Sequence, residues 1–300
     1  MEESDLRVLR RGSSAPKREV PSPDVRDYSS FDHDRFARLA ANAVEQSWMD
    51  DSLLLSETAR AYAIAAGHNW QECVRWVEKT PANTDDPETL FRLFPEAKLL
   101  QMVRDPRATF ASRKKRLVNR YGQYTKAHRL VREWNRSTRQ IPRSLQRGPH
   151  YLVIRYEDFV QAPREGLEQI CRFIGIDCLP ELFNPTRGGQ QWQGNSSFQN
   201  GFSGISADSV DHWKKELTED EVCWVEMHCR PGMQLAGYPL QTQGRFSLSR
   251  WLKRLPGESW RGYFRARRGS LCQLAGLLEH CRYDAASTQV RIKVLSDRGG

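Results

Sequence analysis

Apolar residues near the start of the chain recur every three or four positions, as they do on one face of a helix. The first such pattern predicts a helix from Asp32, which is a suitable N-cap. Its apolar face consists of Phe36, Leu39, Ala40, Ala43 and Val44. A second helix is predicted from near Ser52 to Gly67, since glycine readily ends a helix, and a short third one over residues 87–94. The folded part of the chain is therefore expected to begin with helices.

Further along, the pattern predicts strands over residues 73–79, 98–103 and 151–159. The second of these, KLLQMV, is almost continuously apolar, which is typical of a parallel strand covered on both faces. Helical patterns occupy residues 105–118, 124–141, 164–173, 209–217 and 220–229. Strands that alternate with helices of ten or more residues predict an α/β fold with a parallel sheet.

Composition divides the chain into three parts. Residues 1–30 are rich in Pro, Ser and Arg and poor in apolar residues, so we expect them to be disordered. Residues 31–243 contain the predicted helices and strands and are expected to form one α/β domain. Within it, residues 184–209 form a Gly-, Asn- and Ser-rich loop, and loops of that length are usually functional or mobile. Residues 244–300 form a C-terminal extension.

The net charge of +9 is concentrated in that extension. Between Arg245 and Arg268 there are eight basic residues and one acidic residue, Glu258, a local net charge of +7 that leaves +2 for the rest. The main domain therefore lacks the charge excess of a nucleic-acid-binding protein. The aromatic and basic residues of the extension suit binding to an acidic polysaccharide, an anionic membrane surface or a nucleic acid. The alternative is that the extension is a solvated basic segment that binds none of them.

The seven cysteines form no Cys-x-x-Cys pair and have no histidine at zinc-ligand spacing. We expect reduced, structural thiols and no metal. No apolar run reaches the roughly 18 residues of a membrane span, and the first residues lack the apolar core of a signal peptide. A cytoplasmic location is the resulting expectation.

A cluster of polar residues is predicted where the second strand ends, in the sequence LLQMVRDPRATFAS. Arg104 follows the strand, Asp105 can cap the next helix, and proline prefers the position of Pro106. Free amides at such a helix start favour an anion, and Ser112, seven residues after Asp105, returns to nearly the same helical face. This arrangement predicts a site for a phosphate dianion. The alternative is that Arg104 pairs with Glu157 or Asp158 and Ser112 is a surface residue.

Several ordered motifs together resemble one family. They are EKTPAN, LFPEAKLLQMVRDPRATFAS, YLVIRYEDFVQAPREGLEQICRFIGI, GNSSF and DHWKKEL, spread over residues 70–240. They resemble sulfotransferases that use 3′-phosphoadenosine 5′-phosphosulfate (PAPS), in particular the carbohydrate and protein-tyrosine branch. The resemblance implies a P-loop-NTPase-like fold, a three-layer parallel sheet flanked by helices. It also implies PAPS as co-substrate and a hydroxyl or amine of a carbohydrate or a protein tyrosine as acceptor.

The same resemblance assigns roles to individual residues of the donor site. It places Arg104 and Ser112 on the 3′-phosphate of the donor and Tyr156 near the nucleotide. The segment from Asn195 through Ser196 to Ser197 matches a loop that closes on the donor. Trp213 and Lys214 match a tryptophan-and-basic pair that starts a helix.

Sulfuryl transfer requires charge neutralisation in an in-line transition state. Lys79, at the end of the first predicted strand, could neutralise the developing charge on the leaving phosphate, or could be a solvated lysine. Ser197 could donate a hydrogen bond to the same oxygens. Glu57 is the candidate catalytic base by the family's pattern of a glutamate in the first third of the chain, but its place on a predicted helix favours a surface role.

The chain departs from the family at its start. Members begin with a strand and a loop like PRSGTT, whose amides and basic residue hold the 5′-phosphosulfate. Residues 1–75 contain only two glycines, Gly12 and Gly67, and the stretch RRGSSAP follows no apolar strand. A truncated gene product, a degenerate member and a site completed in another way all fit this pattern. The sheet is therefore expected to be incomplete at its N-terminal end. The alternative function is a protein that binds a nucleotide or polyanion without turnover.

Overall fold

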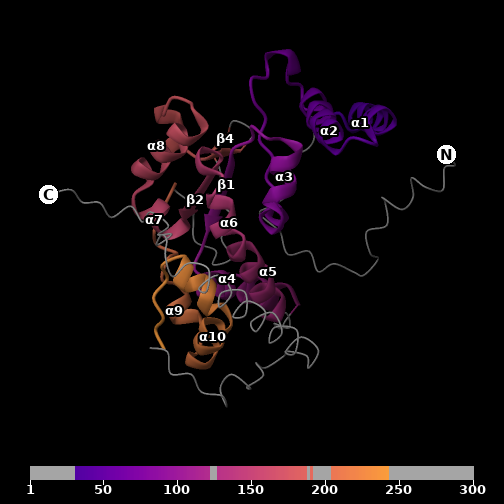
Figure 1. The fold of residues 1–300 in the computed structure, drawn as a ribbon. Helices are drawn as coiled ribbons and strands as arrows, with labels where there is room; N and C mark the ends of the chain where they lie inside the picture. Colours follow the sequence, from indigo (N-terminus) through magenta and orange to yellow (C-terminus); the bar gives the residue numbers. More distant parts are fainter. Residues whose placement is uncertain (1–30, 122–126, 188–189, 192–203, 243–300) are drawn as a thin grey trace.

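The computed structural model describes residues 31–121, 127–187, 190–191 and 204–242 (Figure 1). The helices in chain order are α1 (His33–Ser47), α2 (Asp51–Ala65), α3 (Pro87–Leu93), α4 (Pro106–Tyr121), α5 (Ala127–Arg139), α6 (Ile141–Leu145), α7 (Tyr156–Gln161), α8 (Pro163–Ile174), α9 (Trp213–Glu216) and α10 (Glu219–Leu235). Short 3-10 turns are η2 (Trp70–Glu72), η3 (Pro81–Asp85), η4 (Gly148–His150) and η5 (Pro180–Phe183). The strands are β1 (Leu99–Val103), β2 (Tyr151–Arg155), β3 (Thr186–Arg187) and β4 (Gln190–Gln191).

The α/β class is confirmed by the parallel pairing of β1 and β2. Leu99 lies opposite Tyr151 and Val103 lies opposite Arg155, so both strands end at the same edge. Over the described ranges this sheet has two strands, while β3 and β4 form a separate antiparallel pair. The third predicted strand ends earlier than expected, at Arg155, because Tyr156 begins α7.

Only one face of β1 is well covered, contrary to the expectation from its apolar sequence. Gln101 and Val103 are buried, whereas Leu100 and Met102 are 42% and 45% exposed. The core lies among β1, α4, α5 and α10, and the three helices lie in the lower half of Figure 1. Its fully buried large side chains include Phe110, Leu130, Val131, Ile141, Val225 and Met233.

The strand predicted over residues 73–79 is wrong. These residues are extended, but no strand among the described residues pairs with them, and Val74 and Val77 are 91% and 93% exposed. An extended segment becomes a strand only when a neighbour completes its hydrogen-bond ladder. The segment is held instead by side chains, including Trp76, whose ring centroid lies 5.8 Å from that of Phe94.

The N-terminal helices form as predicted. The Asp32 carboxylate accepts from the Arg35 amide at 2.8 Å, and Gly67 ends the second helical segment with a φ of +82°, a conformation that suits glycine. Asp50 is the cap of α2 and accepts from the amides of Ser52 and Leu53. Figure 1 shows α1 and α2 lying side by side, apart from the other helices.

The later helices differ from the prediction mainly in their bounds. The helix predicted over residues 124–141 is α5 followed by the separate α6, with residue 124 outside the described ranges. The segment over 209–217 is helical only in α9, and the last helix extends to Leu235 despite Pro231.

Candidate functional site

Arg104 occupies the position where β1 ends and α4 begins. Its carbonyl accepts from the Trp134 indole at 2.9 Å, which fixes the backbone at this point. Its guanidinium carbon lies 4.5 Å from the centroid of the Tyr156 ring, so β1 and the start of α7 bring these two predicted residues together. The Nε atom of Arg104 is buried and has no hydrogen-bond partner among the described residues. The site thus presents an arginine with one buried donor that no described residue uses.

In the described part of the chain, Arg104 pairs with neither Glu157 nor Asp158, which was the alternative. Asp158 faces Arg155, whose Nε lies 3.7 Å from its carboxylate. Glu157 is 6% exposed and accepts from the Asp105 amide at 2.9 Å and from the Tyr238 hydroxyl at 2.7 Å. Glu157 is therefore hydrogen-bonded to other donors, and Asp158 is ion-paired with Arg155.

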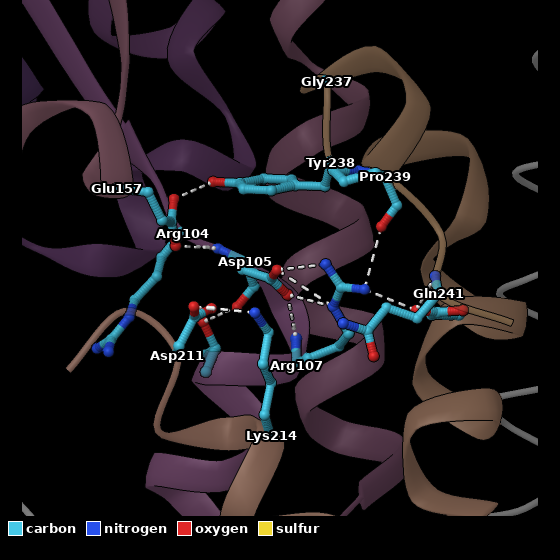
Figure 2. A network of polar contacts seen from close by, with 12 residues as sticks. Arg104, Asp105, Arg107, Glu157, Asp211, Lys214, Gly237, Tyr238, Pro239 and Gln241 are labelled. Carbon is cyan, nitrogen blue, oxygen red and sulfur yellow. Dashed lines mark hydrogen bonds and ion pairs between the residues drawn. The ribbon is translucent and has the colours of Figure 1, made fainter. Parts of the chain in front are cut away.

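Asp105 caps α4, as the sequence predicts, and also joins a buried ion-pair cluster. Its carboxylate accepts from the Arg107 amide at 2.8 Å and from the Arg107 side chain, where Nη2 lies 2.6 Å from Oδ2. The Arg107 Nη1 atom donates to Glu226 at 2.7 Å and to the Pro239 carbonyl at 3.0 Å. Figure 2 shows how this guanidinium lies between the start of α4 and the segment after α10.

Burial controls the electrostatics of this cluster. Asp105, Arg107 and Glu226 are 5%, 3% and 1% exposed. Burial opposes the charged guanidinium, but the hydrogen bonds and charges of Asp105 and Glu226 outweigh it and raise the pKa of Arg107 above its usual value. The Trp213 ring covers the same guanidinium, with its centroid 4.3 Å from the central carbon. Arg107 is therefore a permanently charged, rigidly held group.

The segment after α10 is tied to the strand end by a second set of contacts. Gly237 has a φ of +72°, which turns the chain so that Tyr238 can enter the core. The Tyr238 hydroxyl donates to Glu157 and lies 3.1 Å from the Val103 carbonyl. Burial, and then the neighbouring Glu157 carboxylate, raise the pKa of Tyr238. This phenol remains protonated and donates to the carboxylate.

The other predicted site residues occupy varied positions. Ser112 is half-buried on α4, and Lys214, nearly half exposed on α9, pairs with Asp211 at 2.9 Å. Lys79 lies in the exposed extended segment, outside the polar network of Figure 2. Ser196 and Ser197 lie outside the described residues. Among the described residues, no cluster of three or more His, Cys, Asp or Glu could hold a metal ion.

Glu57 has the surface role that the sequence favours. It lies on α2 and pairs with Arg60 at 2.6 Å, and α2 lies apart from α4 and α7 in Figure 1. A hollow of about 500 Å³ also lies at this end of the molecule, lined by residues of α1, α2 and η2, including Arg35, His68 and Trp70. It contains none of the predicted site residues.

Sequence reasoning missed Arg107, Glu226, Tyr238 and Ser209, whose hydroxyl lies 3.2 Å from that of Tyr156. A signal for Glu226 was present, because it falls on the apolar face of its helix with Val222, Val225 and Cys229. A carboxylate at such a position must have a partner. The partner, Arg107, is 119 residues away in sequence, so local spacing could not identify it.

Residues 2–181 match the sequence model of the Sulfotransferase family, which covers more than half of the chain. Carbohydrate sulfotransferase 7 of Mus musculus is 36% identical over 107 residues, which are 34% of this chain and 21% of that protein. Carbohydrate sulfotransferase 4 of the same species is 28% identical over 180 residues, 50% of this chain and 45% of that protein. The chain spans less than half the length of these curated relatives.

A solved structure, the sulfotransferase domain from the curacin biosynthetic pathway, is also similar. It is 21% identical, with a TM-score of 0.43 over 67% of this chain and 79% of that one. In the part of the chain that the structure describes, no helix is long and apolar enough to cross a membrane.

Proposed function

Because this chain belongs to the sulfotransferase family, we propose that it transfers a sulfuryl group from PAPS to a hydroxyl or amine of a carbohydrate or a protein tyrosine. The carbohydrate is the first choice, since the curated relatives are carbohydrate sulfotransferases. The observation that carries the proposal is Arg104, whose guanidinium packs on Tyr156 at the end of β1 with a buried, unbonded Nε.

Arg104 suits the 3′-phosphate of the donor for physical reasons. A guanidinium forms charge-assisted, often bidentate hydrogen bonds with phosphate oxygens. The helix that starts two residues later, at Pro106, adds the favourable end of its dipole. Stacking on Tyr156 restricts the arginine before the ligand arrives, so less conformational entropy is lost on binding. Ser112, Tyr156 and Lys214 are the further donor contacts that we propose.

The transfer step itself requires charge neutralisation at the 5′-phosphosulfate of PAPS, away from the 3′-phosphate. We assign Lys79 and Ser197 to the sulfuryl and bridging oxygens, where negative charge develops as the sulfur–oxygen bond to the leaving phosphate breaks. The family match begins at residue 2 and therefore includes Arg11, Gly12 and Ser13. An arginine, a glycine and a serine are the residue types of a loop that holds a phosphosulfate, so this stretch is our candidate for it.

The decisive experiment measures transfer of labelled sulfate from PAPS to a panel of glycans and tyrosine peptides. Sulfated product on at least one acceptor is the expected result. Binding of 3′,5′-ADP without any transfer would favour the alternative function, a nucleotide-binding relative without turnover. Absence of both binding and transfer would refute the proposed donor site.

Arg104→Ala tests the assigned phosphate contact directly. Loss of a charge-assisted hydrogen bond should weaken 3′,5′-ADP binding by roughly 1.5–3 kcal/mol in titration calorimetry. Arg38→Ala, which removes an exposed arginine from α1, is the matched control and should leave the affinity unchanged. Equal affinities for the two variants would remove Arg104 from the site.

The basic extension is proposed to recruit a polyanionic acceptor. Deletion of residues 245–300 should reduce retention on immobilised heparin and leave 3′,5′-ADP binding intact. The retention that the extension provides should fall steeply with salt, because salt screening shortens the range over which exposed charges interact to about 8 Å at physiological ionic strength. Deletion of residues 276–300 alone keeps the eight basic residues up to Arg268 and serves as control. Equal retention of both truncated proteins would contradict the recruiting role.

A further inference from the structure

Three buried carboxylates belong to the polar network that begins beside Arg104, at Asp105. Asp105 is adjacent to Arg104 in sequence, and Glu157 and Glu226 are 6% and 1% exposed. Like charges repel strongly where water is excluded, so unneutralised carboxylates here would oppose a phosphate dianion. The site therefore requires a cation that is dedicated to its own acidic residues.

Arg107 has the geometry of that cation. Its Nε and Nη2 atoms contact both oxygens of Asp105 at 2.6–3.1 Å, and its Nη1 atom reaches Glu226 and the Pro239 carbonyl. Trp213 covers one face of the guanidinium. With these contacts Arg107 is fully engaged inside the protein, whereas Arg104, three residues before it, retains a free donor.

Glu226 fixes the orientation of Arg107 from the opposite side. It projects from α10 and accepts from the amides of Gln241 and Thr242 at 2.9 and 3.0 Å and from the Thr242 hydroxyl at 2.5 Å. These bonds join α4, α10 and the segment after α10 at one point (Figure 2). Glu226 and this segment lie beyond residue 181, where the family match ends.

We propose that Arg107, oriented by Glu226, is a positioning residue that neutralises Asp105 and thereby gives the Arg104 site its preference for a phosphate dianion. The inference rests on the proposed function, because it requires that Arg104 receive the 3′-phosphate. Arg107 itself does not touch the ligand. Its effect should therefore be on the contribution of the 3′-phosphate alone.

The experiment compares the affinities of the full chain for 3′,5′-ADP and for 5′-AMP, which lacks the 3′-phosphate. The ratio of the two affinities isolates that phosphate. Arg107→Met should lower the ratio at least about tenfold, because it leaves an unneutralised Asp105 carboxylate beside the anion. The double variant Asp105→Asn/Arg107→Met removes both charges and should restore the ratio to within about twofold of the original.

Two further variants keep the result interpretable. Arg113→Met removes another ion-paired arginine from α4, whose partner Glu133 is on α5, and should leave the ratio unchanged. Glu226→Gln keeps the size of the side chain and should lower the ratio about threefold through a less fixed Arg107. If Arg107→Met fails to fold, the affinity ratio of Glu226→Gln tests the role of Arg107 in its place.

The outcomes separate the inference from the function on which it rests. If the original chain binds neither nucleotide, both are overturned. If it binds 3′,5′-ADP but Arg107→Met weakens both nucleotides equally, Arg107 has only a structural role and the inference alone is overturned. A ratio that the double variant fails to restore, or that Glu226→Gln leaves unchanged, overturns the corresponding role of Asp105 or Glu226.

Discussion

The pair formed by α1 and α2 differs from the helices around the strand end in what it buries. Within the pair the buried residues are small: Ala43, Ser47, Ala61 and Ala65. None of its large apolar side chains is fully buried, and Trp48 and Met49, in the link between the two helices, are 67% and 78% exposed. Around the strand end, by contrast, Phe110, Val131 and Met233 are completely buried.

This difference explains where the polar cluster is found. Buried ionic groups are tolerated only where surrounding packing holds them in good geometry and offsets their desolvation. The body formed by α4, α5 and α10 supplies that packing, so it can hold Asp105, Arg107 and Glu226 away from water. The helical pair is stabilised by caps at Asp32 and Asp50 and by the contact of Tyr62 with Phe36, none of which encloses a large buried core. Stability and ligand binding should therefore depend on the same body.

The largest expected effect is that of truncating a core side chain. Phe110→Ala should lower the free energy of unfolding by about 3–5 kcal/mol, because it leaves a cavity where a fully buried ring packs near Trp224. Tyr62→Ala, on the exposed side of α2, should change it by less than about 1 kcal/mol. Urea unfolding monitored by tryptophan fluorescence measures both. Similar losses for the two variants would show that the helical pair unfolds together with the body.

A smaller loss is expected from Tyr238→Phe. Without the hydroxyl, one oxygen of the buried Glu157 loses its donor, which should cost about 1–3 kcal/mol. Tyr62→Phe removes an exposed hydroxyl and is the matched control. Chemical denaturation near neutral pH provides the comparison. An unchanged stability of Tyr238→Phe would mean that water replaces the hydroxyl.

The same variant changes the response to alkaline pH. Burial raises the pKa of Tyr151 to about 12 and also raises that of Tyr238, whereas unfolded tyrosines ionise near 10. The protonated phenols of Tyr151 and Tyr238 contribute fully to the free energy of unfolding below pH 10, and this contribution is lost as the pH rises toward their folded-state pKa. Stability should therefore fall between about pH 10 and 12, and less steeply in Tyr238→Phe, which has one buried phenol fewer.

The sequence predicted the local features of the fold because they depend on neighbouring residues. The caps at Asp32 and Asp105 and the glycine end at Gly67 follow from residues close in sequence. The parallel pairing of β1 and β2 follows from the alternation of strands with helices. The contact of Arg104 with Tyr156 was also accessible, because parallel strands place their ends at one edge.

The remaining features depend on partners that a sequence pattern does not contain. Residues 73–79 have a strand composition, but no neighbouring strand in the described part pairs with them. Arg107 and Glu226 are separated by 119 residues, so the apolar face around Glu226 indicates that it needs a partner but does not identify Arg107. Tyr238 enters the core only because Gly237 turns the chain. Long-range pairing of this kind is a property of the tertiary structure.

The smallest expected effects concern the two helix caps, and they separate local from global stability. Thr218 caps α10 through a capping box with Glu221, so Thr218→Ala should destabilise the whole body by about 1 kcal/mol. Asp50→Ala should instead loosen only α2, seen as faster amide hydrogen exchange in residues 51–55 without a shift in the unfolding midpoint.

The Leu53 amide, and then the Ser52 hydroxyl, lower the pKa of Asp50 below its ordinary value of 3.8. The cap is therefore complete above pH 3.8 and is lost as the pH falls through the lower, folded-state pKa. Acid titration of the Ser52 and Leu53 amide signals by NMR should show this change in the original chain and not in Asp50→Ala. A global unfolding transition at that same pH would show instead that the helical pair and the body are one cooperative unit.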